Sequence, residues 1–211
     1  MQMNRTDRLS ISSDACPHLQ FVLQEQWVSC FFPLLQKGVM VRARVGCSVK
    51  KFLCEQTGIT EETLAKIQSI FLDGRPLDDL DLATIRDGST LALSAAMPGL
   101  VGATLRRGGA YSSFRSTITY RETDSQCVSC EGFVQVKLFN LLMAELGPGF
   151  FKRGVFVMSS DLRDFLAEQS GDFWLGFRRV LLDGKPIEVG SLLHNEWSLR
   201  ERVFLCVVFQ E

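Results

Sequence analysis

Histidine is scarce in this chain: His18 and His194 are the only two in 211 residues. General acid–base catalysis usually relies on a histidine or on paired carboxylates with shifted pKa values. His194 falls in a predicted loop, where a lone histidine is far more often a surface residue than a catalytic base. The chain also lacks a phosphate-binding loop, a dinucleotide-binding glycine pattern and a nucleophile elbow. The sequence therefore predicts a non-catalytic protein.

Long hydrophobic runs are absent as well, because no stretch approaches the roughly 18 apolar residues needed to span a bilayer. The net charge is -1, so there is no global basic field to attract nucleic acid or an anionic membrane. Residues 1–14 are polar and lack the hydrophobic core of a secretory signal. We therefore expect a cytoplasmic protein without a membrane partner, for which nucleic acid is a disfavoured partner. The sequence leaves the oligomeric state open.

The seven cysteines are odd in number and irregular in spacing, which is typical of free thiols in a reducing compartment. Cys127 and Cys130 form a C-x-x-C pair, which could supply half of a tetrahedral zinc site. The other half would come from one of two pairs, Cys16 with His18 or Cys47 with Cys54. The alternative is that the thiols of Cys127 and Cys130 are unpaired on a loop. No other cofactor is expected.

An internal repeat is the strongest signal in the chain. Residues 52–58, FLCEQTG, recur as residues 165–171, FLAEQSG, with five of seven positions identical. Residues 71–77, FLDGRPL, recur as residues 181–187, LLDGKPI, with four of seven identical. Two unrelated motifs in the same order and nearly the same register indicate a duplicated structural unit. The alternative is two unrelated αβ units that share turn chemistry.

The first motif predicts a helix in each copy. Val49, Phe52 and Leu53 are spaced so that they share one helical face. The same spacing recurs in the second copy, at Leu162, Phe165 and Leu166. Predicted N-caps are Ser48 and Ser160, and the predicted left-handed residues that end the helices are Gly58 and Gly171.

Strands are predicted around each helix, and the third strand of each copy ends at an Asp-Gly turn. In the first copy the strands are expected at residues 19–23, 39–45, 70–72 and 90–93. In the second copy they are expected at residues 133–139, 155–158, 180–182 and 203–209. Each copy would then be one helix packed across a small mixed sheet.

The order of these elements, the DGRPL turn at residues 73–77 and the IRDGSTL segment at residues 85–91 resemble the β-grasp, ubiquitin-like superfamily. In that superfamily a Gly-Lys-x-Leu turn follows the third strand and a Ser-Thr-Leu segment opens the last one. The resemblance covers residues 19–94 well and residues 133–209 less closely, because residues 190–201 lack a Ser-Thr-Leu segment. It implies an α+β fold of two tandem β-grasp domains, each a small mixed sheet with one main helix. It does not imply a function, because this scaffold hosts many.

These patterns divide the chain into four parts. We expect a disordered N-terminal tail over residues 1–14, a first β-grasp domain over 15–96, a glycine-rich basic linker over 97–130 and a second β-grasp domain over 131–211.

The linker carries the one local charge asymmetry, because no acidic residue lies between Asp87 and Glu122. One interpretation is a flexible tether whose arginines are solvated or paired with acids such as Asp78. The other is an ordered segment that binds an acidic protein surface, a phosphate or a nucleic acid, with Ser116 to Tyr120 as an extra strand. The candidate partner-binding residues are Arg106, Arg107, Gly108, Gly109, Arg115 and Arg121.

Three functions stay open at this stage. The first is an interaction module or adaptor that binds an unidentified protein through its sheet faces and the linker. The second is a zinc-binding module that uses Cys127 and Cys130. The third is a precursor of a Gly-Gly modifier or sulfur carrier, because Leu105 to Gly109 resembles the Leu-Arg-Gly-Gly tail of ubiquitin. That tail is internal here, so a protease would have to cut after Gly109.

Overall fold

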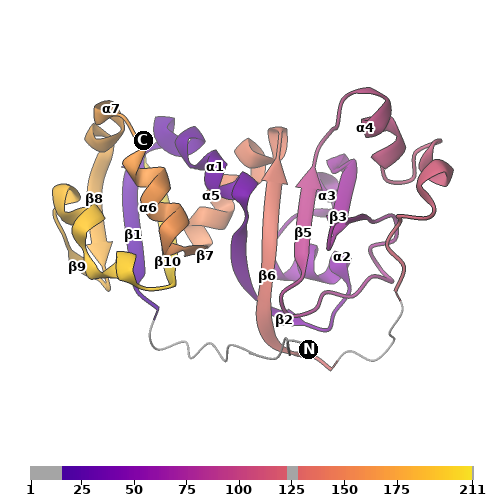
Figure 1. Ribbon diagram of the computed structural model, residues 1–211, viewed down its shortest axis with the longest axis horizontal. Coiled ribbons are helices and arrows are strands. Elements are labelled where there is room, and N and C mark those ends of the chain that lie inside the picture. The colour runs from indigo at the N-terminus through magenta and orange to yellow at the C-terminus, as the bar shows by residue number, and fades with distance from the viewer. Residues whose placement is uncertain (1–15, 123–127, 211) are drawn as a thin grey trace, which may run out of the picture.

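The structure is a computed structural model that describes residues 16–122 and 128–210 (Figure 1). Its strands form one mixed ten-stranded sheet in the order β4-β3-β5-β6-β2-β7-β10-β1-β8-β9. The predicted α+β class is confirmed, but the strands lie in one continuous sheet and not in two separate small sheets as expected. No helix in the part of the chain described here is long and apolar enough to cross a membrane.

All eight predicted strands are present, with ends that differ from the predicted ones by three residues at most. The strands are β1 (His18–Gln24), β2 (Val39–Val45), β3 (Ser69–Leu72), β4 (Arg75–Pro76), β5 (Thr90–Ser94), β6 (Cys130–Phe139), β7 (Val155–Met158), β8 (Phe177–Leu182), β9 (Lys185–Pro186) and β10 (Arg202–Gln210). The short strands β4 and β9 are the return strands of two hairpins. Each hairpin turns at an Asp-Gly pair in which both residues have positive φ, as a type I′ turn requires.

The helical elements connect these strands. They are η2 (Glu25–Phe31), α1 (Phe32–Lys37), α2 (Val49–Lys51), η3 (Phe52–Gln56), α3 (Glu61–Lys66), α4 (Gly99–Leu105), η4 (Ser112–Arg115), α5 (Leu141–Arg153), α6 (Ser159–Ala167), α7 (Gly171–Leu175), η5 (Val189–His194) and η6 (Glu196–Leu199). The two predicted helices correspond to α2 with η3 and to α6, and all six of their predicted core residues are buried.

The caps of these two helices differ from each other. Ser48 accepts a hydrogen bond from the amide of Lys51 at 3.2 Å, and Gly58 has a φ of 70°, as predicted. The predictions for the second copy were wrong. Ser160 lies inside α6, which begins one residue earlier, and Gly171 is the first residue of α7 rather than a left-handed end. The second helix ends without a left-handed glycine, so the repeat shares its apolar pattern but not its caps.

Strands are exchanged between the two copies of the repeat. β1 precedes the first helix in the sequence, yet it pairs in parallel with β10 and antiparallel with β8 of the second copy. β6 precedes the second helix, yet it pairs antiparallel with β2 and in parallel with β5 of the first copy. We call β4-β3-β5-β6-β2 the first half of the sheet and β7-β10-β1-β8-β9 the second half. Each half therefore contains a strand from the other copy.

The two halves meet through a single residue pair, Met40 of β2 and Phe156 of β7. Figure 1 shows α1 and α5 in the space between the halves. Gly147 of α5 lies so close to α1 that a Cβ atom at this position would be 2.7 Å from the Cδ1 atom of Leu35. Side chains alternate along β1, β6, β7 and β10, so that one face of each strand lies in the buried core and the other is partly exposed. The helices α1 and α5 thus hold the two halves together where β-pairing is least extensive.

Candidate functional site

The connecting segment between the two copies is ordered over residues 95–122. It contains α4 and η4, which pack against each other at one end of the molecule (Figure 1). The extra strand predicted for Ser116 to Tyr120 is wrong, because these residues form turns that follow η4. Among them, the amide of Tyr120 donates to the carbonyl of Pro76 at 2.8 Å, so the segment runs along the first half of the sheet.

Arg115 is the centre of this packing, and it is 4% exposed. Its guanidinium donates to the carboxylate of Asp78 at 2.6 Å and to the Thr119 hydroxyl at 2.9 Å. It also donates to the carbonyls of Thr104 at 2.7 Å and Arg106 at 3.3 Å. Because a buried charge is tolerated only when it is paired and hydrogen-bonded, these contacts fix the segment's conformation.

The predicted Gly-Gly residues lie in a turn that is held against the first half of the sheet. The amide of Arg107 donates to the carbonyl of Gln68 at 2.7 Å. The amide of Gly108 donates to Asp78 at 3.1 Å, and its φ is 62°. The amide of Gly109 donates to the carbonyl of Arg106 at 3.1 Å. This stretch is therefore folded back on the protein and not extended.

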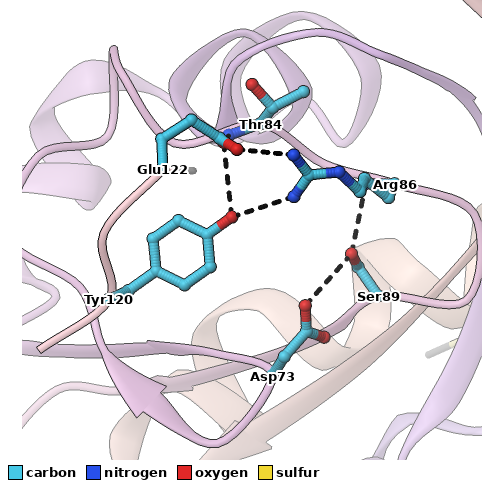
Figure 2. Close-up of polar contacts among 6 residues, drawn as sticks. All are labelled: Asp73, Thr84, Arg86, Ser89, Tyr120 and Glu122. Atoms are coloured by element: carbon cyan, nitrogen blue, oxygen red, sulfur yellow. Dashed lines mark hydrogen bonds and ion pairs between the residues drawn. The ribbon is translucent and has the colours of Figure 1, made fainter. Parts of the chain in front are cut away.

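A second polar network anchors the end of the segment (Figure 2). The guanidinium of Arg86 forms an ion pair with Glu122 and donates to the Tyr120 hydroxyl at 3.1 Å. Glu122 also accepts from the amide of Thr84 at 2.8 Å. Burial raises the pKa of the Tyr120 phenol, and the bonds to Glu122 and Tyr120 raise the pKa of Arg86. The segment is thus fixed at both Arg115 and Glu122.

The remaining candidate arginines, Arg106 and Arg121, are exposed. Tyr111 and Phe114 lie near them in sequence and stack with ring centroids 6.1 Å apart, and Phe114 is 79% exposed. We use the name linker surface for the two exposed arginines together with five exposed apolar residues of the same segment, namely Leu100, Val101, Tyr111, Phe114 and Ile118. The sequence indicated the charge of this surface, but it did not separate buried Arg115 from its exposed neighbours.

The structure describes all of the predicted zinc ligands except Cys127. Cys127 lies outside the described residues, and Cys130 is exposed at the start of β6. Cys16 and His18 lie at the beginning of β1, where the Cys16 thiol donates to the carbonyl of Arg202. Within residues 16–122 and 128–210, no group of three or more His, Cys, Asp or Glu side chains could hold a metal ion. The zinc site therefore stays a prediction that depends on Cys127.

Beside the linker surface lies an open cavity of about 620 Å³ between α3 and the turn that follows β4. Arg107 and Lys50 line it, but so do four carboxylates, from Glu61, Asp78, Asp79 and Asp81. Arg107 also donates to the carbonyl of Leu64 at 3.4 Å. Four carboxylates outnumber two cations, so the lining of this cavity is acidic, and Arg107 helps to hold the segment rather than extend the exposed basic surface.

Comparisons with protein-family models, with curated proteins and with solved structures found no match.

Proposed function

We propose that this protein is a non-catalytic cytoplasmic adaptor that holds an acidic segment of a partner protein against the linker surface. The observation that carries the proposal is the presence, on one ordered segment, of two exposed arginines and five exposed apolar residues. Exposed apolar side chains that gather on one part of a protein mark interaction sites. Function is also concentrated on connecting segments held by a rigid scaffold.

Charge determines which partner fits this surface. Arg115 is neutralised by Asp78, so Arg106 and Arg121 set the sign of the exposed part. Guanidinium groups bind carboxylates through paired, charge-assisted hydrogen bonds. Nucleic acid is also anionic, but its binding draws on many phosphate contacts, and the net charge of -1 provides no extended basic field for them. An acidic protein segment is therefore the favoured partner.

The aromatic pair supplies the apolar part of the contact. Tyrosine and arginine are enriched among the residues that dominate binding energy at protein interfaces. Tyr111 and Phe114 lie between Gly108 and Arg115, which both bond to Asp78, so the turn that carries them is fixed before a partner arrives. A preordered surface loses less conformational entropy on binding than a flexible one.

The scaffold in this proposal is a pair of β-grasp modules that share strands. Support comes from the repeated helix motif, from the two Asp-Gly hairpins and from the five-stranded mixed arrangement found in each half. In this arrangement the linker surface belongs to the first module, because both anchors of the segment are on the first half. The anchors are Asp78 and Arg86.

The proposal is tested by affinity purification of the tagged full-length protein from its own source, with quantitative mass spectrometry of the recovered proteins. The wild type is compared with an Arg106→Glu/Arg121→Glu double variant and with Phe114→Ala. The matched control is Arg200→Glu/Lys185→Glu, which changes two exposed cations of the second copy.

We expect a partner in equimolar amount with the wild type and the control, and its loss from both linker variants. Release of this partner should increase with salt, because exposed charges are screened. Recovery of the same proteins by all four forms would contradict the proposal. If nucleic acid is recovered as well, and nuclease treatment releases the partner protein, then the linker surface binds RNA or DNA and not a protein.

A further inference from the structure

A second site lies where the two halves of the sheet meet. β7 begins at Val155, directly after Gly154, which has a φ of 89° and ends α5. β2 continues past the Met40–Phe156 pair as far as Val45. β2 and β7 run antiparallel, so beyond Met40 the edge of β2 that faces away from β6 is beside the end of α5 and not beside a strand. A cavity of about 470 Å³ fills this gap, and we call it the seam pocket.

Gln56 occupies the β2 edge at one end of the seam pocket. Its side-chain amide accepts from the amide of Arg44 at 2.8 Å and donates to the carbonyl of Arg44 at 2.9 Å. These two bonds satisfy the backbone groups that a neighbouring strand would otherwise pair with. At this end the seam pocket is thus bounded by the Gln56 side chain, which bonds to the backbone of β2 in place of a neighbouring strand.

Three phenylalanines from different elements line the pocket, Phe150 of α5, Phe156 of β7 and Phe204 of β10. The rings of Phe156 and Phe204 lie 4.9 Å apart. A Cβ atom at Gly154 would be 2.1 Å from the Cζ atom of Phe204. The Phe204 ring therefore packs directly against the backbone of Gly154, where a side chain would not fit. These contacts give the pocket an apolar wall with a defined shape.

The charged groups that line the pocket are of one sign. Arg42 and Arg153 face it, and no aspartate or glutamate does so among the described residues. The Arg153 guanidinium lies 5.1 Å from the centre of the Phe150 ring, and burial lowers the pKa of Arg153. In the described part of the chain no carboxylate forms an ion pair with it. Among the residues that the structure describes, Arg42 forms an ion pair with the exposed Glu131, at 3.4 Å.

We infer that the seam pocket binds a small organic anion with a flat apolar body, such as an aromatic sulfonate or carboxylate. Its charged group meets Arg153 and Arg42, and its rings lie against Phe156 and Phe204. The pocket volume is within the range of about 300–1,000 Å³ that is typical of small-molecule sites. Such sites occur preferentially between structural units, as here. This site is separate from the linker surface and does not depend on the adaptor function.

The test uses two fluorescent probes that share one ring system. The first, 8-anilinonaphthalene-1-sulfonate, carries a negative charge, and the second, N-phenyl-1-naphthylamine, is neutral. Each is titrated against the full-length protein, its Arg153→Gln and Arg42→Gln variants and two controls. The controls are Arg163→Gln, an exposed arginine of α6, and Phe114→Ala on the linker surface.

We expect saturable binding of the sulfonate, with about tenfold weaker binding to Arg153→Gln, because one charge-assisted contact is lost. The neutral probe should bind all forms alike, and both controls should match the wild type. A shift of the Gln56 side-chain amide signal in nuclear magnetic resonance spectra should accompany sulfonate binding.

Equal sulfonate affinity of the wild type, Arg153→Gln and Arg42→Gln would overturn the inference. So would the absence of saturable binding, or its loss in Phe114→Ala. If Arg153→Gln does not fold, the inference is tested by the sulfonate affinity of Arg42→Gln and by the shift of the Gln56 side-chain amide signal.

Discussion

The guanidinium of Arg115 lies 2.6 Å from the carboxylate of Asp78, and this ion pair joins the connecting segment to the turn that follows β4. Asp78 also accepts from the amide of Gly108, so one carboxylate fixes two points of the segment. The exposed linker surface is therefore held by a buried contact beneath it. Two residues that the sequence grouped together, Arg106 and Arg115, thus have different environments.

Arg115→Ala should loosen the connecting segment. The substitution removes the cationic partner of Asp78, which keeps only the Gly108 amide as a described donor, and it removes the guanidinium donor to two carbonyls. Breaking a buried ion pair costs about 3–5 kcal/mol. Asp78 is partly exposed, so we expect the lower end of that range, about 3 kcal/mol, in the free energy of unfolding. Thermal unfolding measures the effect. Arg106→Ala is the control and should change stability by less than about 0.5 kcal/mol. Equal stability of both variants would contradict this role of Arg115.

Gly102→Ala should disrupt α4, because an added Cβ atom would be 1.8 Å from the carbonyl oxygen of Met97. Overpacking of this kind costs about 1–3 kcal/mol. Gly149→Ala in α5 is the matched control, since nothing lies within 4 Å of its added Cβ atom. Alanine there should stabilise the protein by about 0.5–1 kcal/mol. Chemical denaturation of both variants checks the pair, and the same sign of change in each would count against the prediction.

A fragment of residues 16–96 should not fold by itself. It contains β1 without its neighbours β8 and β10, and it lacks β6, which lies between β5 and β2. Co-expression of residues 16–122 with 128–210 should restore the sheet, because all strands are then present. Dispersion of amide signals in nuclear magnetic resonance spectra distinguishes the two outcomes. A well-dispersed spectrum from the short fragment would show that the copies do not depend on exchanged strands.

Cysteine alkylation should follow exposure. Cys130 is exposed, whereas burial raises the pKa of the Cys206 and Cys16 thiols and lowers their thiolate fraction near neutral pH. Iodoacetamide at pH 7.5, followed by peptide mass spectrometry, should modify Cys130 before Cys16 and Cys206. Raising the pH should speed the two slower reactions, because more thiolate forms. Denatured protein, in which all sites react alike, is the control.

The same experiment tests the zinc hypothesis. If Cys130 and Cys127 hold zinc, a chelator should speed alkylation of Cys130, and added zinc should slow it. An alkylation rate of Cys130 that neither treatment changes would remove the metal-binding function.

Local patterns in the sequence determined the elements of this protein. Alternation of apolar residues predicted the strands, the spacing of Val49, Phe52 and Leu53 predicted a buried helical face, and Asp-Gly pairs predicted both hairpins. These signals succeed because they depend on neighbours within a few residues along the chain. The helix α5 was not predicted, since Gly147, Pro148 and Gly149 interrupt its pattern and its stability comes from packing against α1 and β10.

Strand pairing and the candidate sites were decided by the tertiary structure. The alternation of apolar residues in a strand specifies which face is buried but not which strand lies beside it. The sequences of β1 and β6 therefore did not indicate that each strand pairs with strands of the other copy. Charge counts marked the linker as basic, but only the position of Asp78 buried Arg115 and left Arg106 exposed. The seam pocket likewise exists because β2 and β7 separate after one pair, a contact between residues far apart in the chain.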